Sequence, residues 1–183
     1  MKSSINRNCL FSLILILAVS SCKKDESTST YSTKYPVFVS LNTLSYAELG
    51  SALSQGTFVT LRPRTTDKGT KVEISNGAST QAYTLPADDY RSFRFGLGGI
   101  IVGTNYMGEP LAYDLACPNC DRTDYRLTVS TSGTATCGHC HIVYNLNNYG
   151  FIDNTENNTI HSEPRGLYRY RADITTAVVH VFN

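Results

Sequence analysis

The sequence predicts an all-β domain, and three observations support this. Short runs of alternating apolar and β-prone residues recur along residues 35–183, separated by clusters rich in Gly, Pro, Asn and Ser. Only one segment resembles a helix: Ser45 and Glu48 have capping-box spacing, which predicts a short helix ending near Leu53. Hydrophobic residues form 41% of the chain, enough for the core of one domain. We therefore expect a β-sandwich or barrel.

The first half of the domain alternates strands with turns. Residues 62–69 are polar and contain a proline, which predicts a loop. Asn76-Gly77 favours a tight turn between two alternating runs, so residues 62–92 are predicted to form a hairpin insertion on the main sheet. The predicted strands of this half are 36–41, 57–61, 71–75, 81–85 and 93–95.

The second half continues in the same way. Residues 145–163 are rich in Asn and Gly and are predicted to be mostly loop. The predicted strands are 99–103, 111–115, 125–129, 134–136, 142–144, 167–172 and 177–182.

The N-terminus has the features of a targeting segment. Basic residues precede an apolar run at 10–19, which is too short to span a bilayer and is typical of a secretory signal. Val19-Ser20-Ser21-Cys22 resembles the lipobox of bacterial lipoproteins, which implies a signal peptide at 1–21 and lipidation of Cys22. Residues 22–34 are polar and are predicted to form a flexible tether.

The resemblance to lipoproteins implies a lipid anchor in the cell envelope of a Gram-negative bacterium. Lys23 follows the lipidated cysteine, so the aspartate that can retain lipoproteins at the inner membrane is missing, and we expect the outer membrane, on its periplasmic or outer face. A formal net charge of +1 gives no reason to expect a nucleic-acid partner. We expect a monomeric domain whose membrane contact is the lipid.

The remaining cysteines form two Cys-x-x-Cys pairs separated by sixteen residues. This arrangement is typical of paired metal knuckles, and four thiolates suit zinc, a single iron or an iron–sulfur cluster. Disulfides and a redox dithiol are the alternatives in an exported protein. Pro118 and Gly138 suit such turns, the proline by fixing φ and the glycine by tolerating positive φ. The predicted ligands are Cys117, Cys120, Cys137 and Cys140.

Two histidines flank the last of these cysteines. His139 and His141 are alternative ligands or hydrogen-bond donors to sulfur, or else exposed knuckle residues. No spacing in the chain indicates a Ser-His-Asp or Cys-His nucleophile, and cysteines held by a metal are poor hydrolytic groups. We therefore expect an electron-transfer or binding module rather than an enzyme.

The run from Gly99 to Gly150 resembles the Rieske iron–sulfur domain. The motifs that carry this resemblance are Gly99-Ile100-Ile101-Val102-Gly103, Leu111-Ala112-Tyr113-Asp114-Leu115-Ala116-Cys117-Pro118, Cys137-Gly138-His139-Cys140 and Tyr144-Asn145-Leu146. The resemblance covers most of residues 35–183. It implies a Rieske-like β fold with a two-knuckle metal subdomain at about 112–150, similar to rubredoxin or a zinc ribbon.

The chain departs from the Rieske pattern at both histidine ligands. A Rieske cluster has two irons, one held by two cysteines and the other by two histidines. Asn119 and Cys140 stand at the two histidine positions, Cys117 and Cys137 keep the cysteine positions, and Cys120 supplies a fourth thiolate. The implied occupant is a four-thiolate [2Fe–2S] cluster, a rubredoxin-like single iron or structural zinc.

Two functions follow from these occupants. With iron, we expect a lipid-anchored domain that exchanges electrons with a redox partner protein. The alternative is a structural or binding surface lipoprotein whose degenerate Rieske site holds zinc or disulfides.

Overall fold

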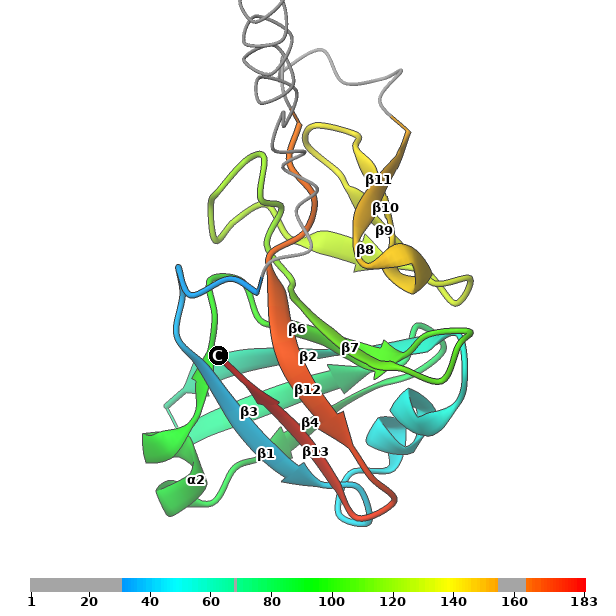
Figure 1. Cartoon of the computed structure of the whole chain (residues 1–183). Coiled ribbons are helices and arrows are strands. Elements are labelled where there is room, and N and C mark those ends of the chain that lie inside the picture. The colour runs from blue at the N-terminus through cyan, green and yellow to red at the C-terminus, as the bar shows by residue number, and fades with distance from the viewer. Residues whose placement is uncertain (1–30, 68, 155–163) are drawn as a thin grey trace, which may run out of the picture.

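The computed structural model describes residues 31–67, 69–154 and 164–183 (Figure 1). The predicted signal peptide, Cys22 and most of the predicted tether lie outside the described residues. Strands dominate the described chain and its helices are short, so the all-β prediction is confirmed. Among the described residues, no helix has the length and hydropathy that crossing a bilayer would require.

The larger sheet is antiparallel and curls on itself. Val39 of β1 and Val181 of β13 share one buried core with Ile74 of β3, although β1 and β3 lie near opposite ends of the sheet. The strands, in spatial order, are β4 (Thr80–Thr84), β3 (Gly69–Ser75), β2 (Thr57–Thr66), β6 (Ile100–Thr104), β7 (Pro110–Asp114), β12 (Arg169–Ile174), β13 (Val178–Phe182), β1 (Val37–Asn42) and β5 (Arg94–Phe95).

A smaller antiparallel sheet packs beside the outer face of β6 and β7 (Figure 1). Tyr113 of β7 is fully buried between the sheets, and its hydroxyl donates a hydrogen bond of 2.9 Å to the carbonyl of Leu146. In spatial order the strands of this sheet are β11 (Phe151–Asn154), β10 (Val143–Asn145), β9 (Thr134–Cys137) and β8 (Leu127–Val129).

Strand β6 is buried on both faces, which explains its continuous apolar sequence. Ile100 and Val102 face the core of the curled sheet, whereas Ile101 faces the second core under the smaller sheet. Side chains alternate along a strand, so a strand covered on both sides needs apolar residues at every position. Residues of β6 and β7 therefore form one side of the second core, and three of the candidate metal ligands are part of this core.

The predicted loop at 62–69 is wrong, because strand β2 runs on to Thr66. Pro63 lies opposite Val72 of β3, but the pairing of β2 with β6 ends at Leu61. Pro63 therefore has a sheet neighbour on one side only, where a missing N–H is tolerated. The predicted pairing of 71–75 with 81–85 is confirmed by the register of β3 and β4.

The predicted short helix exists as the 3₁₀ helix η1 (Ala47–Leu53), but the predicted capping box is wrong. No side chain caps η1; the carboxylate of Glu48 instead accepts a hydrogen bond of 2.5 Å from Tyr83. Three other elements were not predicted. The helix α2 (Ala87–Ser92) lies at the end of the predicted hairpin insertion 62–92, and η2 (Leu146–Asn148) with β11 occupies part of the predicted loop 145–163.

Candidate metal centre

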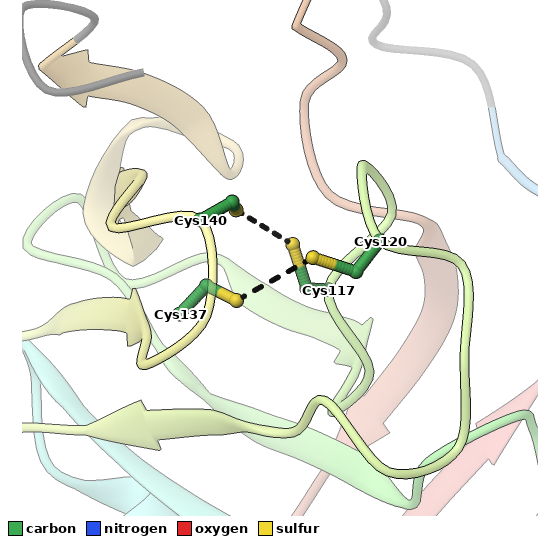
Figure 2. A group of neighbouring side chains, drawn as sticks. All are labelled: Cys117, Cys120, Cys137 and Cys140. Carbon is green, nitrogen blue, oxygen red and sulfur yellow. Dashed lines mark hydrogen bonds between the residues drawn. The ribbon is translucent and has the colours of Figure 1, made fainter. Parts of the chain in front are cut away.

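The two cysteine pairs lie at the junction of the two sheets. Strand β7 ends at Asp114, and the loop that leaves it carries Cys117 and Cys120 before the chain enters β8. The hairpin of β8 and β9 then ends at Cys137, and Cys140 lies in the turn that leads into β10. The fold thus brings the two pairs, distant in sequence, to face each other (Figure 2).

Both pairs have the same knuckle backbone. The amide of Asp121 donates to the carbonyl of Cys117 at 2.8 Å, and the amide of His141 donates to the carbonyl of Cys137 at 3.0 Å. Asp121 and His141, each directly after the second cysteine of its pair, have positive φ values of 52° and 59°. This left-handed residue closes each turn.

Gly138 does not use the positive φ that a glycine tolerates. Gly138 is not among the positive-φ residues, and a Cβ added to it would meet nothing within 4 Å. The strained position lies three residues later, at His141. A glycine would be expected there, since a side chain costs about 1 kcal/mol or more in this region.

The four sulfur atoms form one compact group. The Sγ atoms of Cys117 and Cys140 are 3.5 Å apart, those of Cys120 and Cys137 are 3.8 Å apart, and all four lie within 4.8 Å of one another. A tetrahedral ion with metal–sulfur distances of about 2.3 Å places its ligand sulfurs about 3.8 Å apart. All four thiols are free. Their donor type and spacing therefore fit one tetrahedral metal ion.

The burial of the four thiols differs. Cys117, Cys137 and Cys140 are at most 1% exposed, whereas Cys120 is half-buried at the edge of the group. Burial and the neighbouring Cys117 raise the pKa of Cys120, and burial raises the pKa of Cys140 to about 12. Burial also opposes ionisation of Cys137, but hydrogen bonds from the amides of Cys140 and His139 lower its pKa. A cation among these sulfurs would stabilise the thiolates that burial disfavours.

Tyr144 and Asn119 support the buried side of the group. The hydroxyl of Tyr144 lies 3.4 Å from Sγ of Cys117, and its oxygen accepts a hydrogen bond of 2.7 Å from Nδ2 of Asn119. Asn119 also donates to the carbonyl of Arg165 at 2.8 Å and accepts from its amide at 2.7 Å. Asn119 therefore holds the segment before β12 against the first knuckle. The sequence pattern did not predict this structural role of Asn119.

The two histidines have different surroundings. Nδ1 of His139 lies 3.5 Å from Sγ of Cys120, and its ring stacks on Tyr125 with centroids 4.0 Å apart. His141 is exposed, and no contact of its ring with a sulfur is found in the described chain. The structure thus places His139 beside the thiol group and His141 on the outside of the second knuckle.

A buried carboxylate holds the base of the first knuckle. Asp114 is fully buried and accepts four hydrogen bonds, from the amides of Leu97, Gly98 and Ala116 and from the hydroxyl of Tyr170. A Cβ on Gly98 would lie 2.5 Å from the amide nitrogen of Ala116. The glycine-rich turn before β6 therefore wraps this carboxylate and fixes the chain that enters Cys117.

A second polar cluster attaches the start of the domain to the first knuckle. Asp121 accepts hydrogen bonds from Tyr35 at 2.8 Å and Tyr168 at 2.9 Å, and its carboxylate pairs with Lys34. Partial burial opposes ionisation of Asp121, but these three donors keep its pKa below the ordinary value. The end of the predicted tether is thereby fixed close to Cys120.

Comparison of the chain with protein-family models, with curated proteins and with solved structures finds no match.

Proposed function

We propose that this protein is a lipid-anchored, Rieske-like domain of the Gram-negative cell envelope that holds a single iron ion and transfers electrons. The observation that carries the proposal is the thiol group itself, whose four sulfurs lie within 4.8 Å of one another. Cys117, Cys120, Cys137 and Cys140 would be the ligands. Bound there, iron would supply one-electron chemistry, exchanging between its ferric and ferrous states.

The spacing of the sulfurs favours one ion over the [2Fe–2S] cluster. In such a cluster two irons and two sulfides separate the two pairs of protein ligands, so sulfurs on opposite irons stand farther apart than around one ion. The two knuckles would have to move apart to admit it. The closely packed second core, which includes Cys117, Cys137 and Cys140, opposes that movement.

The position of Cys120 supports electron transfer. It is the least buried of the four thiols, and His139 and Tyr125 stack beside it at the edge of the domain. Electrons would have a short path from this sulfur to a partner that docks over His139. The other three thiols are closed from water, which would protect the ion from loss.

A reductive titration tests this function. The mature protein, purified from the producing cell in detergent without oxygen, is expected to be coloured when oxidised and to bleach reversibly with dithionite. His139→Ala would expose Cys120 and is expected to shift the midpoint potential, whereas His180→Ala, on the distant strand β13, should not. A metal-bound protein that is colourless and silent to dithionite would contradict electron transfer.

Zinc is the second candidate, because three of the four thiols are themselves members of a hydrophobic core. An ion in such a position would cross-link β7, β9 and β10 and supply folding energy, on the order of 10 kcal/mol in isolated zinc modules. The domain would then be a structural or binding lipoprotein. Chelation is expected to lower its melting temperature strongly; an unchanged melting temperature after zinc removal would exclude this role.

A further inference from the structure

A groove lies between the two sheets, and none of the four cysteines lines it. Its walls come from the outer face of β2, β3 and β4 on one side and from β8 with the residue before it on the other. The cavity volume is about 380 Å³, within the range of small-molecule sites. The hydroxyl-bearing residues Thr60, Ser75 and Thr128 line it together with Glu73 and two arginines.

The two arginines come from different sheets. Arg62 lies on β2 and Arg126 immediately precedes β8, and both side chains are half-buried. Nε of Arg126 donates a hydrogen bond of 2.9 Å to the carbonyl of Gly98, which fixes one edge of its guanidinium. Within the described residues neither Arg62 nor Arg126 forms an ion pair. Two cations, of which Arg126 is fixed by its hydrogen bond to Gly98, thus border the same groove.

The carboxylate nearest to Arg62 along the sheet is already used. Glu73 of β3 lies opposite Arg62 in the strand register, but it pairs with Nε of Arg64 at 2.8 Å. Burial, and then the charges of Arg62 and Arg64, lower the pKa of Arg126. Glu73 also lines the groove, but its single carboxylate is shared among three arginines. An anion bound there would relieve the remaining repulsion between the guanidinium groups.

We propose that this groove binds a small polar molecule through an oxyanion, a carboxylate or a phosphate, held between Arg62 and Arg126. A guanidinium presents parallel N–H donors that match such anions. The volume corresponds to roughly a dozen water molecules, at about 30 Å³ each, which suits an acidic monosaccharide. The hydroxyls of Thr60, Ser75 and Thr128 would face the hydroxyl-bearing body of that ligand.

Calorimetric titration of the mature protein in detergent tests this site. The probes are glucuronate, glucose 6-phosphate and neutral glucose, at a fixed ionic strength of about 0.15 M that screens unspecific attraction. At least one acidic sugar should bind saturably, and more tightly than glucose. The preference between carboxylate and phosphate identifies the anion. No saturable binding of either acidic sugar, or equal binding of glucose, overturns the proposal.

Variants locate the site. Arg62→Gln and Arg126→Gln should each weaken binding at least tenfold. The side chain of Arg62 makes no hydrogen bond within the described chain, so Arg62→Gln should leave the melting temperature unchanged. Arg126→Gln should differ in this respect only through loss of the Arg126–Gly98 contact. Lys71→Gln removes the same charge from the same sheet face outside the groove and should bind as the parent does. If Lys71→Gln weakened binding as much as the arginine variants do, the effect would come from net charge alone, and the proposed site would be wrong.

Discussion

Asn119 donates a hydrogen bond of 2.7 Å to the hydroxyl oxygen of Tyr144, which leaves the phenolic proton free to be donated to Sγ of Cys117, 3.4 Å away. Burial and the adjacent Cys117 raise the pKa of Tyr144, so the phenol stays protonated and remains a donor. Asn119 thus orients a hydrogen-bond donor toward the thiol group.

We expect Tyr144→Phe to lower the midpoint potential of an iron-loaded centre, because a lost hydrogen bond to sulfur leaves more negative charge at the ion. It should also cost about 1–3 kcal/mol of unfolding free energy, since Asn119 loses a buried partner. Denaturant unfolding and redox titration measure both effects. Tyr125→Phe is the control, because its hydroxyl has no hydrogen-bond partner in the described chain; if both variants behave alike, the contact with Cys117 is unimportant.

His141→Gly should stabilise the protein by about 1 kcal/mol, because His141 holds a left-handed conformation that favours glycine. Gly138→Ala, in the same knuckle, should change stability by less than about 1 kcal/mol. Thermal unfolding of the metal-loaded protein compares the two. A loss of metal in His141→Gly would instead assign the imidazole a role at the ion, so metal content is measured alongside.

Gly98→Ala should destabilise the domain by about 2–4 kcal/mol, since the added Cβ would lie 2.5 Å from the amide of Ala116 and displace the turn around Asp114. Gly50→Ala provides the matched control, because a Cβ there meets nothing within 4 Å. Equilibrium denaturation measures both. Equal stability of the two variants would mean that the turn adapts easily and does not fix the entry to Cys117.

Cys22→Ser should abolish membrane association and leave the metal content unchanged, since Cys22 is the predicted lipidation site and the thiol group is complete without it. Fractionation of cells with mass spectrometry of the N-terminus measures the first effect. A serine variant that still partitions with membranes would contradict the predicted anchor.

The alternation of apolar residues predicted most strands, because burial on one or both faces fixes that pattern locally. The prediction of strands failed where the position of a residue within the sheet decided whether it belongs to a strand. Pro63 favours a loop in the sequence. It is tolerated in β2 because the pairing of β2 with β6 stops at Leu61, so no β6 residue lies opposite Pro63.

The four cysteines of the centre were predicted from spacing alone, and the fold brings them together. The residues that surround these cysteines could not be predicted from sequence spacing. Asn119 and Tyr144 meet only because β10 packs beside the first knuckle, and the left-handed turns fall on Asp121 and His141 rather than on a glycine. Such contacts between distant segments leave no periodic signal in the chain.

The stoichiometry of metal and inorganic sulfide tests the central claim most directly. We expect the mature protein, purified without oxygen, to contain one iron per chain, no acid-labile sulfide and four reduced cysteines. Lowering the pH should release the ion, because the thiolates then take up protons. Two irons with two sulfides per chain would contradict the single-ion centre, and oxidised cysteines without metal would contradict a metal centre altogether.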